Sequence, residues 1–426
     1  METIFAVSSG APPAAIAIIR LSGEGAFAAA RALAGTLPQS RHAALRALRG
    51  SGGLLLDRAL VLAFPGPDSA TGEDLVELHV HGGRAVVQAV EAALAALPRM
   101  RRAEPGEFTR RALANGRIDL TEAEGLGDLL AAETEGQRRA ALAVAEGAIR
   151  RRAEGWTDRL LALAAQVEAQ LDFAEEDEVD QAAPPAFAME ALALADEIAT
   201  LLAVPPVERL RDGLRVVIAG PPNSGKSTLL NVLAERDAAI VSPISGTTRD
   251  RIEAPVVRDG IAYVLTDTAG LLEETPDPIE RIGIARAEEA MRSADLILWL
   301  GDDEAPQPGA IRIHARADIA ARAVVPSGAD LAVSAATGEG VPALWSLLRD
   351  HAAMLLPRED AVAVNRRQRD LLVLCTDSLR AASGQRDPIV FAEELRLAMK
   401  ALDRLVGRSD VEAMLDALFT RFCLGK

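Results

Sequence analysis

A chain of 426 residues is too long for a single hydrophobic core, so we expect two or three domains. Its formal charge of -16 opposes non-specific adsorption to nucleic acid or anionic lipid, because both carry dense negative charge; any RNA contact must be local or made through a partner. No apolar run approaches the roughly 18 residues of a membrane span, and the two cysteines, Cys375 and Cys423, fit neither a disulfide framework nor a zinc site. With no signal sequence at its start, the chain is expected to be cytoplasmic, with no membrane partner.

Short strand-like runs open the chain. Residues 1–117 mix apolar runs, such as those at 14–21 and 75–80, with Gly and Pro breaks. This pattern of short apolar runs and Gly or Pro breaks predicts a small α+β domain that ends near residue 117.

The texture changes to a helical pattern at residue 118. Ala, Leu, Glu and Arg dominate, and apolar residues recur at helical spacing through about residue 171, within a predicted first helical part at 118–212. A second helical pattern follows later in the chain, within 356–426. The most economical arrangement is one discontinuous all-α domain with the segment 213–355 inserted into it, which makes the whole chain a multidomain α/β protein.

The inserted segment begins with a phosphate-binding loop. Gly-Pro-Pro-Asn-Ser-Gly-Lys-Ser at 220–227 follows an apolar run at 214–219 and precedes a helical pattern at 228–234. Its glycines let backbone N–H groups surround a phosphate at a helix N-terminus. Lys226 would reach the β and γ oxygens of a nucleotide, and the Ser227 hydroxyl would ligate Mg²⁺.

Two later segments favour a Ras-like G domain at 213–355. Gly-Thr-Thr-Arg-Asp at 246–250 offers Thr248, which would complete the magnesium shell once a γ-phosphate is present. A strand-like run then leads into Asp-Thr-Ala-Gly at 267–270, in which Asp267 would hold magnesium through water and Gly270 would sense the γ-phosphate. Either segment alone could be an ordinary turn, but their order and spacing after the phosphate-binding loop favour the nucleotide-binding reading.

Guanine recognition is predicted at Asp318. A carboxylate there would accept both N–H groups of guanine, and adenine would leave it unpaired. GTPases of this type carry Asn-Lys-x-Asp at this point, whereas this chain has Ala-Arg-Ala-Asp at 315–318. We expect the missing asparagine to loosen the loop and weaken affinity. The segment 334–336 still resembles the one that backs the base, so GTP is favoured over ATP.

The hydrolytic machinery departs from that of Ras-like enzymes. Leu271 follows the Asp-Thr-Ala-Gly segment where those enzymes place a water-positioning glutamine, and leucine cannot orient water. No arginine finger is identifiable, so a metal cation held near Asn223 is expected to neutralise charge in the transition state. Asn223 also fits the alternative of a plain loop residue.

Two features of the N-terminal segment fit more than one interpretation. His79 and His81 alternate along a strand and share a face, but without a third ligand a packed or hydrogen-bonded pair is favoured over a metal site. A basic stretch at 99–117 could contact phosphate or form an ordinary solvated face, and it lacks interleaved aromatic residues for base stacking. Its central arginines are Arg101, Arg102, Arg110 and Arg111.

Five further blocks carry a family resemblance over the whole chain. They lie at 17–23, 71–83, 104–110, 115–117 and 422–426, the last reading Phe-Cys-Leu-Gly-Lys. Together with the G-domain motifs they resemble the MnmE (TrmE) family of bacterial tRNA-modification GTPases. The first four are similar to the folate-binding domain of that family, and the last is similar to its C-terminal Cys-Ile-Gly-Lys.

The resemblance implies a tRNA-modifying complex. The expected protein is a homodimer that joins the flavoprotein MnmG (GidA) in a heterotetramer and meets tRNA through that complex. It would add a carboxymethylaminomethyl or aminomethyl group to carbon 5 of the wobble uridine. The one-carbon donor would be a tetrahydrofolate derivative, in the 5-formyl or 5,10-methylene form, and GTP hydrolysis with Mg²⁺ and K⁺ would drive conformational cycling.

The resemblance also assigns individual residues. Potassium would bring two G domains together, and its matched ligands are Asn223, Ser242, Ile244 and Thr247. The water-orienting glutamate of the family matches Glu280. The matched folate contacts are Arg20, Glu77, Arg117 and Lys426, with arginine at 117 where the family usually has lysine. Without the family, each of these charges would be read as a solvated residue or a surface ion pair.

The complete set of expected GTP contacts spans the five segments of the G domain. It comprises Asn223, Ser224, Gly225, Lys226, Ser227, Thr228, Ser242, Pro243, Ile244, Ser245, Gly246, Thr247, Thr248, Asp267, Thr268, Ala269, Gly270, Asp318, Ser334, Ala335 and Ala336. Two other classes of function compete with tRNA modification. A ribosome-assembly GTPase would need a basic RNA-binding module, which is not visible in the sequence, and a non-hydrolysing GTP-gated scaffold would fit the altered base-recognition motif.

Overall fold

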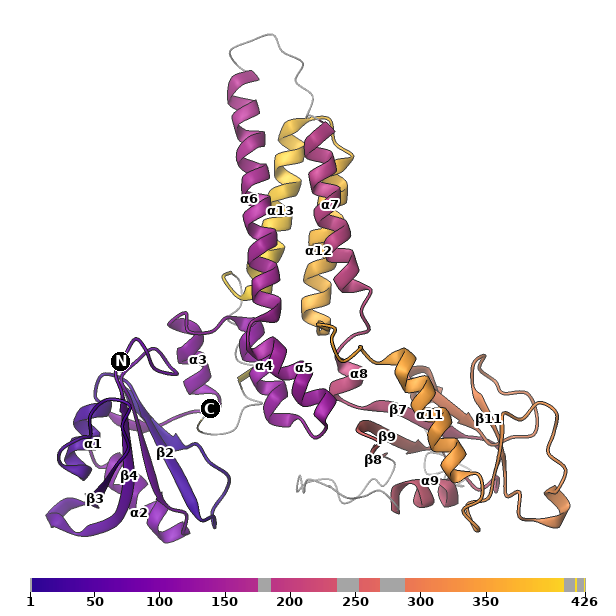
Figure 1. Cartoon of the computed structure of the whole chain (residues 1–426), viewed down its shortest axis with the longest axis horizontal. Coiled ribbons are helices and arrows are strands. Elements are labelled where there is room, and N and C mark those ends of the chain that lie inside the picture. Colours follow the sequence, from indigo (N-terminus) through magenta and orange to yellow (C-terminus); the bar gives the residue numbers. More distant parts are fainter. Residues whose placement is uncertain are drawn as a thin grey trace, which may run out of the picture. The chain divides into compact units, whose positions relative to one another are not determined.

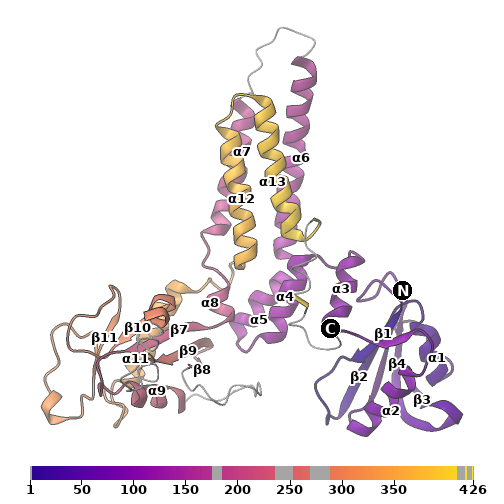
Figure 2. The ribbon, with the colours of Figure 1, turned by 180° about the vertical axis from the view of Figure 1, so that it is seen from behind.

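The structure is a computed structural model that describes residues 2–174, 185–235, 253–268, 288–409, 418–419 and 425 (Figures 1 and 2). The chain forms two compact units. The first comprises Met1–Gly127, Val144–Leu161 and Met399–Lys426, and the second comprises Asp128–Ala143 and Ala162–Ala398. The predicted domain borders at 117, 212 and 355 remain predictions.

A mixed six-stranded sheet forms the centre of the first unit. Its order is β3-β4-β5-β2-β1-β6, and every neighbouring pair is antiparallel except β1 and β6. The predicted strand runs at 14–21 and 75–80 are confirmed as β2 and β5. The strands are β1 (Thr3–Val7), β2 (Ile16–Ser22), β3 (Ala44–Arg49), β4 (Leu55–Phe64), β5 (Leu75–His81) and β6 (Met100–Arg102).

Buried and more exposed side chains alternate along these strands, so one face of the sheet is covered by helices and the other is open. Ile19, Val61 and Leu78 are fully buried in a core shared with α1 (Ala26–Ala34) and α2 (Arg84–Ala95). Arg20 and Glu77, each one residue out of phase with that core, are paired across β2 and β5 on the opposite face. A short turn η1 (Ser51–Gly53) joins β3 to β4, and α3 (Glu107–Ala114) follows β6.

The second unit contains a six-stranded sheet of the order β12-β11-β10-β7-β9-β8. All neighbours are parallel except β8 and β9. The strands are β7 (Leu214–Ala219), β8 (Glu253–Arg258), β9 (Ile261–Asp267), β10 (Leu296–Trp299), β11 (Ile311–Ala315) and β12 (Leu331–Val333). Helices α9 (Lys226–Glu235) and α11 (Val341–Leu355) share its apolar core, and η3 (Ala320–Arg322) follows β11. This is the predicted Ras-like α/β arrangement.

Helices flank this sheet in the sequence on both sides. Before it come α4 (Leu120–Ala131), α5 (Glu135–Ala145), α6 (Ala148–Ala174), α7 (Pro185–Leu202) and α8 (Glu208–Arg211); after it come α12 (Arg366–Ser383) and α13 (Pro388–Val406). The border between the two units falls within α4, α5, α6 and α13.

Helix α7, which precedes the G domain, and helices α12 and α13, which follow it, pack together, as predicted. Helix α7 packs along α12, and Phe187 of α7 lies 6.2 Å from Phe391 of α13 between ring centroids (Figures 1 and 2). The connecting segments also meet, because the Val207 amide donates to the Val364 carbonyl over 3.3 Å. The G domain is therefore an insertion in a discontinuous helical domain.

Two smaller findings concern the thiol and the membrane. Cys375 is fully buried in α12, and burial raises the pKa of its thiol to about 12, so it is not a nucleophile near neutral pH. Cys423 lies outside the described residues. Among the helices that the structure describes, none is both long and apolar enough to cross a bilayer.

Candidate functional site

The phosphate-binding loop lies between the end of β7 and the start of α9. Gly220 and Gly225 have φ values of 153° and 98°, and Asn223 has a φ of 60°, which asparagine tolerates better than most residues. A Cβ atom on Gly220 would lie 3.1 Å from the Cβ atom of Leu300. The loop delivers its backbone amides to the N-terminus of α9, where a phosphate is electrostatically favoured.

Three polar side chains converge beneath this loop. Lys226 is 5% exposed, and its ammonium donates to the carbonyl oxygens of Gly220 (3.1 Å) and Pro221 (2.9 Å). Burial lowers the pKa of Lys226, and the charge of Asp267 opposes that shift. The Ser227 hydroxyl donates to the Asp267 carboxylate over 2.5 Å. A hydroxyl and a carboxylate oxygen this close together suit the oxygen coordination of Mg²⁺.

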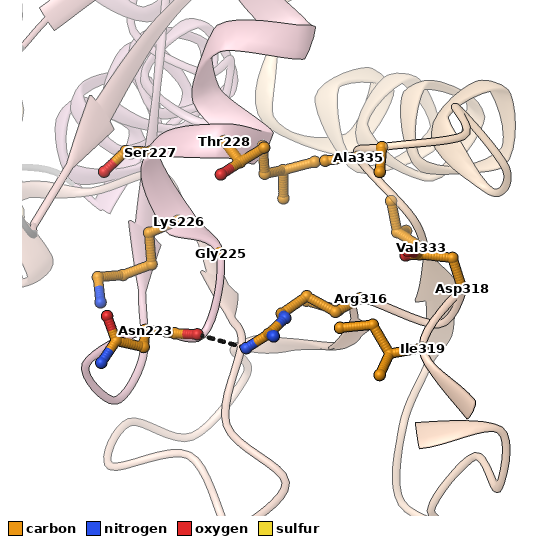
Figure 3. A pocket seen from close by; sticks show the side chains of 13 residues that line it. Asn223, Gly225, Lys226, Ser227, Thr228, Arg316, Asp318, Ile319, Val333 and Ala335 are labelled. Carbon is orange, nitrogen blue, oxygen red and sulfur yellow. Dashed lines mark hydrogen bonds between the residues drawn. The ribbon is translucent and has the colours of Figure 1, made fainter. Parts of the chain in front are cut away.

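A cavity of about 670 Å³ joins the phosphate-binding loop to the predicted base-recognition segments (Figure 3). Its size lies within the usual range for small-molecule sites, about 300 to 1,000 Å³. The predicted contacts that line it are Asn223, Gly225, Lys226, Ser227, Thr228, Asp318, Ala335 and Ala336. Segments separated by about a hundred residues in the sequence thus form one site.

At the far end of the cavity, Ser334 orients Asp318, the carboxylate predicted to read the base. The Ser334 hydroxyl donates to Asp318 over 2.6 Å and accepts from the Thr337 amide over 3.1 Å. Ser334 is fully buried, so its hydroxyl fixes the orientation of the carboxylate, and both carboxylate oxygens keep lone pairs that can accept from a ligand. Ser334 therefore orients Asp318 and does not itself line the cavity.

Two other predicted contacts stand behind the cavity wall. Thr268, which is 3% exposed, donates from its amide and its hydroxyl to the Ile218 carbonyl over 3.2 and 3.1 Å, and this fixes the end of β9 against β7. The Ser224 hydroxyl is buried within the loop and has no hydrogen-bond partner among the described residues. The Thr268 contacts position the neighbouring Asp267, and neither Thr268 nor Ser224 lines the cavity.

Arg316 is a cavity residue that the sequence analysis did not assign. It has a φ of 61°, and its guanidinium donates over 3.0 Å to the backbone carbonyl of Asn223, so it joins the base-recognition segment to the phosphate-binding loop (Figure 3). The sequence did offer a signal for this residue, because Arg316 occupies the position in Ala-Arg-Ala-Asp that lysine occupies in Asn-Lys-x-Asp. We expect this contact to offset part of the loosening predicted from alanine at 315.

We expect Arg316→Ala to raise the dissociation constant for GTP about 3- to 10-fold, the equivalent of one hydrogen bond of about 1 kcal/mol. Ala315→Asn in the same background should recover part of the loss, because it restores a polar side chain beside the loop. The measurement is equilibrium binding of a fluorescent GTP analogue. Arg349→Ala, on the exposed side of α11, is the control. Unchanged affinity in Arg316→Ala would show that the contact is dispensable.

The remaining G-domain predictions lie outside the described residues. They are Ser242, Pro243, Ile244, Ser245, Gly246, Thr247, Thr248, Ala269, Gly270 and the catalytic candidate Glu280. Lys426, the last of the folate candidates, lies outside them too.

In the first unit, two of the folate candidates form an ion pair on the open face of the sheet. The Arg20 guanidinium donates to Glu77 over 2.9 and 3.2 Å and lies 5.8 Å from the ring centroid of Phe108. His79 contacts the other Glu77 oxygen at 3.2 Å. His81 instead contacts Asp57 at 2.7 Å, so each histidine has a carboxylate partner, as the hydrogen-bonded interpretation predicted.

The other described folate candidate, Arg117, contacts Asp68 instead of Arg20 or Glu77. Arg117 follows α3, is 41% exposed at its side chain, and lies 3.6 Å from the carboxylate of Asp68. Near the C-terminus, the Gly425 carbonyl accepts a hydrogen bond of 2.7 Å from the Ser8 hydroxyl, beside the end of β1. The residue before Lys426 is therefore attached to the same sheet as Arg20.

The Arg20 and Glu77 pair predicts a pH effect on stability. Burial alone would raise the pKa of Glu77, but hydrogen bonds from Arg20 and His79 outweigh it and hold the pKa below its ordinary value of 4.5. The stabilisation is therefore present above about pH 4.5 and is lost as the pH falls through the lower, folded-state pKa. Calorimetry should show a lower melting temperature for Glu77→Gln at pH 7, and a smaller difference from wild type at pH 3. The exposed Glu24→Gln is the control, and a difference independent of pH would contradict the assignment.

Comparisons with known proteins identify related sequences along nearly the whole chain. A family model described as the GTP-binding protein TrmE N-terminus matches residues 3–117, and one described as the MnmE helical domain matches residues 120–423. The tRNA modification GTPase MnmE of Erythrobacter litoralis is 57% identical over 426 residues, which is 100% of both chains. That of Rhizorhabdus wittichii is 56% identical over 431 residues, covering 100% of this chain and 97% of its own.

Among solved structures, the G domain of the T. maritima FeoB iron transporter is 23% identical over 33% of this chain and 98% of its own, with a TM-score of 0.24. A TM-score this low supports no functional inference. The two family models and the full-length relatives decide the matter: this chain belongs to the MnmE family of tRNA modification GTPases.

Proposed function

We propose that this GTPase drives the modification of carbon 5 of the wobble uridine in certain tRNAs, as one subunit of a cytoplasmic complex with a flavoprotein of the MnmG type. The observation that carries the proposal is that Lys226, Ser227 and Asp318 line a single cavity, which suits a guanine nucleotide. The relatives of this chain are named tRNA modification GTPases. The added group would be carboxymethylaminomethyl or aminomethyl.

Potassium is the proposed activator of hydrolysis. Asn223 lines the cavity and has a left-handed backbone conformation. Its side-chain amide oxygen is an uncharged oxygen ligand of the kind that coordinates K⁺. Ser242, Ile244 and Thr247 would supply further oxygens. A cation here would bring positive charge to the phosphates where an arginine finger is missing, and Glu280 would orient the attacking water.

A tetrahydrofolate derivative is the proposed one-carbon donor. The Arg20 and Glu77 side chains provide adjacent opposite charges on the open face of the sheet, 23% and 17% exposed, beside the ring of Phe108. Such a combination suits a heterocycle that both donates and accepts hydrogen bonds and carries an acidic tail. Arg117 and Lys426 are the proposed partners of that tail.

A homodimer is proposed through the same unit. Leu45 of β3 and Leu60 of β4 are cross-strand neighbours on the open face and are 58% and 43% exposed, and Ile16 of β2 is 57% exposed. Large apolar side chains gathered on one sheet face are typical of a protein interface. A second copy would remove them from water.

The test is steady-state GTP hydrolysis in potassium and in sodium at matched ionic strength, with ATP as the competing nucleotide. We expect turnover to be specific for potassium and GTP, and to fall about 100-fold or more in Glu280→Ala, because one orienting group for water is lost. Glu289→Ala, an exposed glutamate nearby in the sequence, is the control.

Equal rates in the two salts would refute the potassium mechanism. No turnover in either salt would instead favour a non-hydrolysing, GTP-gated scaffold.

A further inference from the structure

The first unit carries a basic segment in an otherwise acidic chain. Residues 25–67 contain five arginines, Arg31, Arg41, Arg46, Arg49 and Arg58, and a single acidic residue, Asp57. The formal charge of this segment is therefore +4, whereas that of the whole chain is -16. The segment contains no lysine and no glutamate. A charge contrast of this size within one unit marks a surface for an anionic partner.

The fold gathers these arginines around β3, the outermost strand of the sheet. Arg46 and Arg49 lie on β3, and Arg58 lies on β4 opposite Ala47 of β3. Arg31 lies on α1, which packs against β3, and the Arg41 amide donates to the carbonyl of Ala63 in β4 over 2.9 Å. We call these five arginines the basic edge.

None of the basic-edge arginines has a carboxylate within ion-pair distance among the residues that the structure describes. Their contacts are with carbonyl oxygens and rings. Arg46 donates to the Thr36 carbonyl and Arg49 to the Gly53 carbonyl, both over 2.8 Å. Arg31 and Arg41 lie 6.0 and 5.9 Å from the ring centroids of Phe27 and Phe64. Such contacts orient a guanidinium without neutralising its charge.

The basic stretch at 99–117, which the sequence singled out as a possible phosphate contact, behaves differently. Arg101 pairs with Glu107 at 2.6 Å, Arg102 with Glu91 at 3.1 Å, and Arg111 with Glu73 at 2.9 Å. These pairs cancel the positive charge locally. These ion pairs set the stretch apart from the basic edge, whose arginines have no carboxylate partner among the described residues.

The partner chemistry follows from the kind of charge and its placement. Positive residues on an outer strand also prevent edge-to-edge pairing of sheets, but that purpose needs one or two residues on the strand itself. Here five arginines surround the strand, and they come from α1, the turn before β3, β3 itself and β4. Guanidinium groups that no carboxylate neutralises suit phosphates, and Phe27 and Phe64 already lie against arginines. The surface thus fits a phosphate backbone rather than stacked bases.

We propose that the basic edge binds the phosphate backbone of tRNA, and that it is the local contact by which this acidic protein holds RNA. The inference rests on the proposed function in taking tRNA as the substrate. It adds a binding surface that is separate from the nucleotide cavity and from the Arg20 and Glu77 pair.

The test uses the full chain in complex with its flavoprotein, and a triple variant Arg31→Gln, Arg49→Gln and Arg58→Gln. All three side chains are exposed. Each lost phosphate contact should lower the slope of log Kobs against log salt by about 0.7 to 0.9, so the slope should fall by about 2 to 3 in all. We expect tRNA affinity at low salt to drop at least 10-fold, with GTP hydrolysis unchanged.

The matched control neutralises Arg138, Arg139 and Arg396, which are 49%, 50% and 59% exposed and are paired with glutamates. It should keep both slope and affinity near wild type. Equal loss in the control would overturn the proposal, because general charge would then explain binding. Unchanged tRNA binding in the basic-edge variant would overturn it too, as would a loss of flavoprotein binding alone, which would identify a protein interface. Failure of the wild-type complex to bind any tRNA would refute the proposed function and this surface with it.

Discussion

Lys226→Ala should reduce GTP turnover about 100- to 1,000-fold, the cost of removing one preorganised group that stabilises charge in a transition state. The Lys226 ammonium is 5% exposed and is held by the carbonyl oxygens of Gly220 and Pro221, at the mouth of the loop that wraps the phosphates. Because burial already lowers its pKa, a phosphate would strengthen its charged form and gain a strong, desolvated contact.

The measurement is single-turnover hydrolysis with saturating GTP, so that weakened binding does not mask the chemical step. Arg215→Ala is the control, since Arg215 is an exposed residue of β7, the strand that leads into the same loop, and does not line the cavity. A loss below 10-fold would mean that the loop amides and metal ions supply nearly all of the stabilisation.

Asp318→Asn should convert a guanine site into a xanthine site. The carboxylate would accept two N–H groups of guanine, and at about 1.5 to 3 kcal/mol for each charged hydrogen bond, their loss should weaken GTP binding about 100- to 10,000-fold. An asparagine amide offers one acceptor and one donor, and xanthine carries a carbonyl where guanine carries an amino group, so XTP should bind better to the variant than GTP.

Ser334 makes this exchange practicable. Its hydroxyl donates to Asp318 over 2.6 Å and can equally donate to the amide oxygen of asparagine, so the side chain keeps its orientation. Competition between GTP, XTP and ATP for the variant provides the measurement. If GTP remains the preferred ligand of Asp318→Asn, another group reads the base and the assignment is wrong.

Local motifs determine the nucleotide chemistry of this chain. The strand at 214–219, the glycine-rich loop and the helix that begins at Lys226 are contiguous, so the phosphate site is encoded within about twenty residues. The helical segments on both sides are equally visible from their periodicity. The five family blocks outside the G domain then indicate the family, which the full-length relatives confirm.

Tertiary structure decided which side chains work together. Arg316 reaches the carbonyl of Asn223, 93 positions away, and Ser334 orients Asp318 from a different strand end. The motifs contain both residues, but neither contact partner can be read from the sequence, because spacing along the chain does not report distance between loops at the end of a sheet.

The same reason explains the arginines of the first unit. In the sequence, the stretch at 99–117 fitted either a phosphate contact or an ordinary solvated face, and in the structure Arg101 and Arg111 are neutralised by Glu107 and Glu73. The basic edge emerges only when β3, β4 and α1 are assembled. The sequence by itself determined which charges exist and which local loops bind phosphate; only the fold decided which charges are paired, because an ion pair depends on a distance of a few ångströms that folding sets.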